Sequence, residues 1–501
     1  MLSKCRLTSS TADQIPAIVL RRCARSLAIP VATVINICIE QGVFPNTLKE
    51  YRIVPIYKGG DKQSCNNWRP IAISSPLGKI IERILLDQLL DFLAEFNILN
   101  QNQYGFRKAR STALPILQLS DCLRTAKDRG QHSVAVLLDL RKAFDSVSPA
   151  ILRMKLKAYN VSDLACNLLY SFMANRSQCV DIGGSLSSNR TIYFGVPQGS
   201  LLGPTLFSIF INDIFYTCKH SEVLLYADDT SAIISGPNLA DLVHKMNEDL
   251  SSIQGWLDSN CLSINVTKST FLHIRPNNNS PYVTDGLLAI QNEPIVRSGC
   301  AKFLGVMIDD NLSGDAHIAQ LRPKLAGAIA GICRVRKILE TESCLLLYHA
   351  FFSSKMAYGL EYFGLNYANR ILPLLILQKR ALRCIFRVPP LESSRPIFVS
   401  CKILPFPLYI EYILCIQIYK IIQGVNPNIC RLMRSGNNTR GGSSNLLILA
   451  PCVKNVGRNT FAVRGSLMWN VLPESIRAQK SSLSQFKSLL KEFLLNKFAC
   501  Q

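Results

Sequence analysis

The sequence predicts a mixed α/β (α+β) protein with more than one structural unit. Apolar runs typical of strands, such as 133–138 and 223–226, alternate with helical patterns across residues 50–310. Beyond about residue 320 the pattern becomes helical and basic. Because 501 residues exceed what one compact core usually holds, we expect an α/β part followed by a helical part.

The distribution of charge indicates a polyanionic partner. The chain has 56 Lys and Arg against 34 Asp and Glu, a net charge of +22, and residues 321–501 hold 25 basic against 7 acidic side chains. Such an excess favours nucleic acid over a membrane. The most apolar window, 403–419, is short and contains Glu411, so it predicts a buried helix. Residues 1–10 lack a signal-peptide pattern, so we expect an intracellular protein of nucleus and cytoplasm, not a secreted one.

Eighteen cysteines raise the question of zinc or disulfides. No two of them have Cys-x₂₋₄-Cys spacing, and the six histidines form no His-x₃₋₅-His pair. We therefore expect reduced thiols.

Local patterns place most of the elements. Helices are expected within 1–48, at 77–96 and at 483–498, and a strand at 52–57. The Asn, Gly and Ser content of 435–444 predicts a linker.

Three carboxylates follow predicted strands. Asp139 directly follows one apolar strand, and Asp228 with Asp229 joins the apolar runs 223–226 and 230–234, as at the tip of a hairpin. A lone Asp-Asp pair is more often a solvated turn. Two central strands ending in Asp, however, bring carboxylates to one sheet edge, where they can hold two Mg²⁺ ions about 3.5–4 Å apart for phosphoryl displacement.

Three segments resemble the motifs of reverse transcriptases in the same order. They are 138–145 (LDLRKAFD), 195–204 (GVPQGSLLGP) and 226–229 (YADD). Further segments resemble blocks of non-LTR retrotransposon polymerases, especially jockey-like ones. They are 67–71 (NWRPI), 103–107 (QYGFR), 262–268 (LSINVTK), 303–306 (FLGV) and 463–473 (VRGSLMWNVLP).

The resemblance implies a right-hand polymerase. Its units would be fingers at 1–130, a palm with an antiparallel sheet at 131–310, a helical basic thumb at 311–430 and a basic C-terminal region at 431–501. Its activity would be RNA-directed DNA synthesis, by two-metal transfer from a dNTP to a primer 3′-hydroxyl. The implied cofactor is Mg²⁺, as two ions, with Mn²⁺ as an alternative. The implied partners are an RNA template, a DNA primer, dNTPs and, in a ribonucleoprotein, the element RNA, with no membrane.

The same resemblance assigns residues to the chemical step. Asp139 and Asp228 would be the principal metal ligands, and Asp229 would complete the acidic cluster. Lys268 would act as a general acid toward pyrophosphate, although a solvated surface position remains open for it.

Other residues would position the nucleotide. Arg69 and Lys58 would hold the triphosphate, since guanidinium and ammonium groups bind phosphate, although Lys58 could also be an ordinary surface residue. Phe144 would exclude a ribose 2′-hydroxyl, with core packing as the alternative. The turn expected to lie against the nucleotide consists of Pro197, Gln198 and Gly199, where Gln198 could also be purely structural.

Two basic regions suit nucleic acid. Arg107 and Lys108, beside Tyr104 and Phe106, form a basic-aromatic segment for the template or, alternatively, a charged loop. A second set recurs along a predicted thumb helix as a phosphate-facing stripe would: Arg322, Lys324, Arg334, Arg336 and Lys337.

The sequence also departs from the family pattern. Gly314 stands where these elements usually place Trp, which we expect to loosen local packing. No endonuclease-like segment precedes the polymerase region, so polymerase chemistry is expected without its own DNA-cutting domain. The alternatives are a silent relic or recruited nucleic-acid-binding protein, and an RNA-directed RNA or DNA-templated polymerase sharing the palm. The intact carboxylates disfavour the relic, and Phe144 disfavours the other polymerases.

Overall fold

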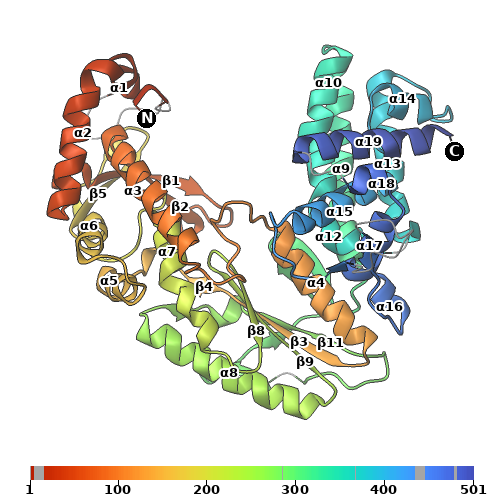
Figure 1. Ribbon diagram of the computed structural model, residues 1–501, viewed down its shortest axis with the longest axis horizontal. Helices are drawn as coiled ribbons and strands as arrows, with labels where there is room; N and C mark the ends of the chain where they lie inside the picture. Colours follow the sequence, from red (N-terminus) through yellow and green to blue (C-terminus); the bar gives the residue numbers. More distant parts are fainter. Residues whose placement is uncertain are drawn as a thin grey trace.

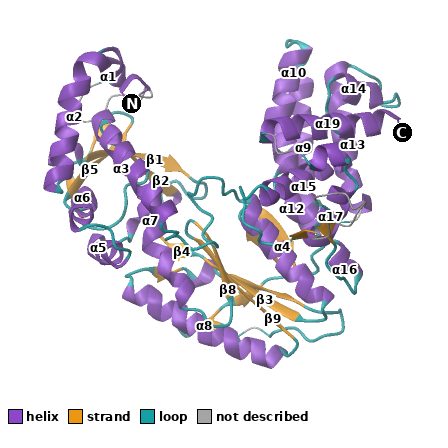
Figure 2. Cartoon of the chain, in the orientation of Figure 1, coloured by secondary structure: helices purple, strands orange, loops and turns teal. Residues whose placement is uncertain are grey.

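The computed structural model describes residues 2–4, 16–284, 286–366, 368–430, 432–434, 446–478 and 482–500. Two arms extend from a central sheet, one built by the N-terminal part of the chain and one by the C-terminal part (Figure 1). The central and N-terminal parts combine strands with helices, whereas the C-terminal arm is almost entirely helical (Figure 2). The predicted mixed α/β fold is therefore confirmed. The predicted linker at 435–444 lies outside the described residues.

Five strands form the central sheet: β3 (His132–Leu138), β8 (Glu222–Tyr226), β9 (Asp229–Gly236), β11 (Thr270–Ile274) and β14 (Val296–Arg297). Their order is β14-β11-β3-β9-β8, antiparallel except for β14 beside β11. Three short pairs accompany the sheet: β4 (Leu140–Arg141) with β10 (Ser263–Ile264), β12 (Ala289–Ile290) with β13 (Glu293–Pro294), and β15 (Cys300–Phe303) with β16 (Val306–Asp309).

The two faces of the central sheet contact different hydrophobic cores. Helices α7 (Gly203–Ile211) and α8 (Leu239–Ser259) belong to one core, and α4 (Ala113–Asp128) belongs to the other. Because side chains alternate along a strand, Val134 and Val136 of β3 enter the first core while Ala135 enters the second. Burial on both faces explains why the sequence of β3 is continuously apolar.

The N-terminal arm holds a second sheet, in the order β2-β1-β5-β6 with β7 also paired to β5. Its strands are β1 (Glu50–Tyr57), β2 (Trp68–Ile73), β5 (Arg176–Ile182), β6 (Ser185–Leu186) and β7 (Arg190–Ile192). Its helices are α1 (Ala17–Arg22), α2 (Ala24–Gln41), α3 (Pro76–Glu95), α5 (Pro149–Ala158) and α6 (Asp163–Met173). The hydroxyl of Ser75 caps α3, where the sequence predicted a helix, by accepting from the amide of Leu77 at 3.2 Å.

The C-terminal arm is a helical bundle. Its longer helices are α9 (Asp315–Val335), α13 (Ala368–Phe386), α15 (Phe406–Ile422), α17 (Phe461–Asn470) and α19 (Leu483–Cys500). The shorter ones are α10 (Thr341–Leu347), a π-helix (Tyr348–Ser353), α11 (Ser354–Ala357), α12 (Leu360–Phe363), α14 (Arg395–Ser400), α16 (Asn455–Arg458) and α18 (Glu474–Arg477). A small pair, β17 (Met433–Arg434) with β18 (Leu447–Ile448), joins α15 to α16. Among the described residues, no helix has the length and apolarity needed to span a bilayer.

The core of this arm reaches beyond the expected domain boundaries. The ring of Tyr419 on α15 stacks on Phe486 of α19 at 4.0 Å, so the C-terminal region shares a core with the thumb-like helices. Helix α4 lies beside this arm as well (Figure 1). Its buried Arg124 donates to the side chain of Asn366 and to the carbonyl of Tyr362, each at 3.1 Å. Helix α4 thus packs with the C-terminal arm and with the central sheet, and the fingers assignment of 1–130 stays a prediction.

Packing around Gly314 is close rather than loosened, contrary to the expectation from sequence. Gly314 has a positive φ of 73°, and its amide donates to the carboxylate of Asp309 at 2.7 Å. A Cβ at this position would lie 2.7 Å from Nδ2 of Asn366 and 3.0 Å from Cβ of Phe363. A bulky residue cannot occupy this backbone without displacing both neighbours.

We expect Gly314→Ala to destabilise the fold by about 1–3 kcal/mol, since it adds both a clash and a strained φ. The control is Gly327→Ala on α9, where an added Cβ meets nothing within 4 Å. That change should be neutral or stabilise by up to about 1 kcal/mol through helix propensity. Urea unfolding of both variants measures the difference, and equal stabilities would contradict the close packing at Gly314.

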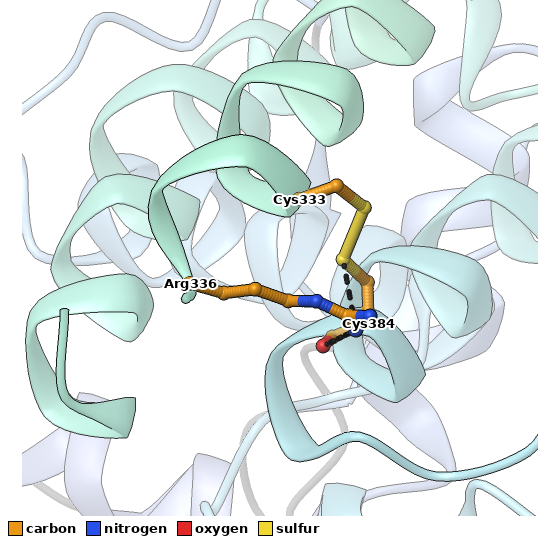
Figure 3. The surroundings of a disulfide bond; sticks show 3 residues. All are labelled: Cys333, Arg336 and Cys384. Atoms are coloured by element: carbon orange, nitrogen blue, oxygen red, sulfur yellow. Dashed lines mark hydrogen bonds between the residues drawn. A yellow bond between two sulfur atoms is a disulfide. The ribbon is translucent and has the colours of Figure 1, made fainter. Parts of the chain in front are cut away.

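A disulfide joins Cys333 of α9 to Cys384 of α13, with the Cα atoms 6.3 Å apart (Figure 3). The expectation of reduced thiols throughout was wrong for this pair, whereas the other described cysteines take part in no disulfide. The partners are 51 residues apart in sequence, so no local spacing could indicate them. Arg336, expected in the phosphate-facing stripe, instead donates to the carbonyl of Cys384.

Candidate active site

The three carboxylates lie at the same edge of the central sheet, on adjacent strands. Asp139 directly follows β3, and Asp228 and Asp229 lie at the tight hairpin between β8 and β9, as the sequence predicted. The register pairs Leu138 with Thr230, so Asp139 continues β3 beside Asp229 on the neighbouring strand. Ala227 opens the turn with a positive φ of 58°.

A segment next to β8 fixes the position of this turn. The amide of Tyr104 donates to the carbonyl of Leu225 at 2.8 Å, and the amide of Leu225 donates to the carbonyl of Asn102 at 3.0 Å. Gly105 follows at the turn itself, where an added Cβ would overlap the amide nitrogen of Ala227 and lie 2.9 Å from its Cα. Only glycine allows the two backbones to approach this closely.

Two residues expected to contact the template have structural roles instead. Tyr104 is fully buried and its hydroxyl bonds to the side chain of Gln118. Arg107 donates to the carbonyls of Asn100 at 2.6 Å and Gln103 at 3.2 Å. Nη1 of its guanidinium therefore bonds to the protein backbone. Phe106 and Lys108 are the exposed members of this segment.

The backbone of Asp139 is held by the segment that contains Lys268. The amide of Asp139 donates to Oγ of Ser269 at 3.2 Å, and its carbonyl accepts from the amide of Asn265 at 2.7 Å. Ser269 Oγ also donates to the carbonyl of Asn265 at 2.9 Å. Sequence reasoning missed Ser269, because its partner is 130 residues away. Lys268 itself is exposed.

The carboxylates perturb one another electrostatically. Burial, followed by the charge of Asp139, raises the pKa of Asp228, while Arg69 and Lys58 oppose this rise. Both cations are exposed on the N-terminal arm and face Asp228 closely enough to act on it. Burial, followed by the charges of Asp228 and Asp139, raises the pKa of Asp229 to about 6. Lys302 on β15 lowers it, and nothing in the sequence had pointed to that cation.

Replacing Asp229 with Asn should raise the melting temperature at pH 8 without divalent metal. The folded state binds the Asp229 proton more tightly than the unfolded chain does, because the folded pKa is about 6 against an ordinary 3.8. Charged Asp229 therefore destabilises the fold, and the wild type should gain stability as pH falls from about 7 toward about 4. The variant should lack this gain. Calorimetry across pH measures both profiles, and a variant less stable at pH 8 would contradict the repulsion.

The donor set fits a divalent cation of the magnesium type. Within the described ranges, no three His, Cys, Asp or Glu side chains converge closely enough to form a metal site by themselves. In the same part of the chain, the carboxylates of Asp139 and Asp229 accept no hydrogen bond and form no ion pair. Mg²⁺ commonly takes only one or two carboxylates and completes its shell with water and substrate phosphate. The carboxylate oxygens at this sheet edge repel one another and are of the type that Mg²⁺ prefers as ligands.

Phe144 packs against two other aromatic rings. Phe144, in a 3-10 helix (Ala143–Asp145), is half-buried and stacks on Phe207 at 4.3 Å, with Phe106 edge-on at 5.9 Å. This packing holds one face of the ring in the core and leaves the residue partly accessible. Both the gating and the packing interpretations of Phe144 remain compatible with its position.

The Pro197–Gly199 turn connects the N-terminal arm with the central sheet. Gln198 donates from its side chain to Asp145 at 2.8 Å, and its carbonyl accepts from the amide of Ala72 on β2 at 2.7 Å. Gly199 has a φ of 123°, and a Cβ there would lie 2.5 Å from the carbonyl oxygen of Ala72. Pro197 is buried beneath the turn.

A sheet edge with three carboxylates, set between an N-terminal arm and a helical C-terminal arm, is the arrangement of nucleotide-polymerising palms. The family model of reverse transcriptase (RNA-dependent DNA polymerase) matches residues 57–308, which is half of the chain. The chain belongs to this family.

Among known proteins, the chain is similar in sequence to RNA-directed DNA polymerases of retrotransposons. The chain is 27% identical over 385 residues to the RNA-directed DNA polymerase from mobile element jockey of Drosophila melanogaster, covering 74% of this chain and 41% of that protein. It is 27% identical over 379 residues to the probable RNA-directed DNA polymerase from transposon BS of the same species, covering 72% and 40%. The chain thus spans about two fifths of the length of these relatives. The resemblance to jockey-like polymerases is confirmed.

A solved structure of apo telomerase from Candida tropicalis, truncated from its C-terminal domain, is similar at 14% identity and a TM-score of 0.38. It covers 53% of this chain and 54% of that one. A similarity this low carries no argument about the site.

Proposed function

We propose that this protein is an RNA-directed DNA polymerase of a non-LTR retrotransposon, which transfers a nucleotide from a dNTP to a primer 3′-hydroxyl on an RNA template. The position of Asp139 beside Asp228 and Asp229 at one sheet edge, within electrostatic range of Arg69 and Lys58, is the observation that carries this proposal. Anionic and cationic groups are then arranged for a metal-bound triphosphate.

Asp139 and Asp228 would be the principal ligands of two Mg²⁺ ions, or of Mn²⁺, and Asp229 would complete the acidic cluster. When bound, such ions supply Lewis-acid polarisation of the attacking hydroxyl and neutralise phosphate charge. Ser269 and Asn265 would keep the first carboxylate at the sheet edge by holding its backbone.

Other side chains would bind the triphosphate, support the nucleotide and donate a proton to the leaving group. Arg69 and Lys58 would bind the triphosphate, with the guanidinium contributing bidentate contacts. The Pro197–Gly199 turn would support the nucleotide through Gln198. Lys268, exposed beside the segment that holds Asp139, would donate a proton to the leaving pyrophosphate.

Phe144 would select the sugar. Truncation by Phe144→Ala should reduce the preference for dATP over ATP, expressed as the ratio of kcat/KM values, by roughly 10- to 100-fold, because a steric filter of this size is typically worth 1–3 kcal/mol. Phe144→Tyr keeps the ring and is the matched control. An unchanged ratio in the alanine variant would favour the packing interpretation.

The nucleic-acid partners would be a DNA primer and an RNA template, in a ribonucleoprotein with the element RNA. Arg322, Lys324, Arg334 and Lys337 are exposed on and after α9, which suits contacts with a duplex backbone. Primer extension on an RNA template with Mg²⁺ and dNTPs tests the proposal. Binding of primer–template without any extension would instead indicate a catalytically silent relative.

A further inference from the structure

A buried carboxylate lies directly behind the Pro197–Gly199 turn. Glu82 of α3 is 1% exposed, and its Oε2 accepts from the amide of Leu201 at 2.6 Å and from that of Leu202 at 3.3 Å. These amides end the turn and lead into the N-terminus of α7, an end that favours negative charge. Burial nevertheless raises the pKa of Glu82 to about 7, so the carboxylate is kept there at an energetic cost.

A buried cation holds the opposite end of the same segment. Arg176 at the start of β5 is 4% exposed and donates to the carbonyls of Phe194 at 2.8 Å, of Gly195 and of Met173 at 2.9 Å. The segment 194–202 is therefore fixed at its beginning by a guanidinium and at its end by a carboxylate. Both charges come from the N-terminal arm, from α3 and β5.

Tyr51 of β1 completes this arrangement. It is 3% exposed and lies close enough to both charges that Glu82 raises its pKa and Arg176 lowers it. Within the described part of the chain its hydroxyl has no hydrogen-bond partner. Buried charged groups often contribute no more to stability than apolar residues of similar volume would. Stability alone therefore does not explain why charged residues occupy these positions.

We propose that Glu82 and Arg176 are positioning residues. They hold the two ends of the segment 194–202, as a clamp, and thereby fix the position of Gln198 relative to the bound dNTP. Neither residue touches the nucleotide, and both act through backbone groups on either side of the turn. Within the segment, the amides of Gly195 and Val196 donate to the carbonyls of Val147 and Phe144, and Gln198 bonds to Ala72 and Asp145. The two buried charges hold the backbone on either side of Gln198. This inference rests on the proposed polymerase function and assigns a cause to the geometry of its nucleotide site.

Steady-state primer extension with Glu82→Leu and Glu82→Gln tests the clamp. The glutamine carbonyl can still accept from both amides, so its KM for dNTP should stay within about threefold of wild type. The leucine variant leaves both amides without an acceptor and should raise that KM by about 10- to 100-fold, with a smaller change in kcat, as expected for a displaced positioning group. Affinity for primer–template should be unchanged in both.

Glu361→Leu supplies the matched control. Glu361 is another buried carboxylate, 5% exposed and bonded to Gln417, but it lies in the core of the C-terminal arm. It should lose stability comparably without raising the KM for dNTP. If Glu82→Leu does not fold, Arg176→Lys replaces it. Arg176 uses donors on both Nε and Nη2, whereas lysine is shorter and has all its donors on one nitrogen, so the variant should raise the same KM.

The outcomes separate the inference from the function it rests on. Extension by the wild type together with an unchanged KM in folded Glu82→Leu or Arg176→Lys would overturn the clamp and leave the polymerase proposal standing. An equal KM rise in Glu361→Leu would also overturn it, because general destabilisation would then explain the effect. Absence of extension by the wild type would overturn both.

Discussion

Asp139→Asn should reduce primer extension by at least about three orders of magnitude. The substitution keeps the shape of the side chain and removes the charge that would hold the metal, and metal coordination contributes several kcal/mol to such a transition state, at about 1.4 kcal/mol per tenfold in rate. The backbone contacts of Asp139 to Ser269 and Asn265 do not involve the carboxylate, so the fold should persist. Single-turnover incorporation of one dNTP measures the loss.

Asp241→Asn is the matched control for this experiment. Asp241 is an exposed acid on α8 that pairs with Lys245, one helical turn along, at 2.7 Å. Its replacement should leave incorporation within about twofold, because surface pairs contribute little. Added Mg²⁺ should raise the melting temperature of the wild type and of Asp241→Asn by similar amounts. The melting temperature of Asp139→Asn should rise much less. Retention of even a tenth of wild-type incorporation by Asp139→Asn would contradict its assignment as a ligand.

Gly105→Ala should lower the rate of incorporation by roughly 100-fold, because Gly105 supports the turn that carries Asp228. The added Cβ would overlap the amide of Ala227, so the turn carrying Asp228 has to shift. A displacement of about 1 Å in a catalytic group can cost this much, while overpacking of one methyl group typically costs 1–3 kcal/mol of stability. Incorporation should therefore fall far more than the fraction of folded protein.

Gly255→Ala on α8 is the appropriate comparison, because a Cβ there meets nothing within 4 Å. That variant should incorporate dNTP at the wild-type rate and be equally or more stable. Wild-type incorporation by a folded Gly105→Ala protein would show that the hairpin is not held by the segment 102–105.

The elements that carry the carboxylates could be predicted from sequence because their signals are local. An unbroken apolar run ending in Asp139 and two apolar runs around Asp228 and Asp229 indicate buried strands and a tight turn without knowledge of the rest of the chain. The residues that hold these elements could not be found in this way. Ser269 reaches Asp139 across 130 residues, and Glu82 reaches Leu201 across 119.

Burial was the other quantity that the sequence could not supply. Tyr104 and Arg107 stand in a segment typical of nucleic-acid binding, yet their side chains form hydrogen bonds within the protein. Helix α4 likewise follows the N-terminal elements in sequence but packs with the C-terminal arm through Arg124. Which elements pack together, and which side chains are buried as a result, depends on contacts between apolar faces that are distant in sequence. Periodicity within one segment does not determine these contacts.

The central claim is that the sheet edge at Asp139, Asp228 and Asp229 is a metal-dependent site of DNA synthesis. Incorporation of a single dNTP into a DNA primer annealed to an RNA template, with Mg²⁺ and again with excess EDTA, tests it most directly. We expect one-nucleotide product with Mg²⁺, none with EDTA, and recovery when Mg²⁺ is restored. Product that forms equally in EDTA, or no product from folded protein that binds the primer–template, would contradict the claim.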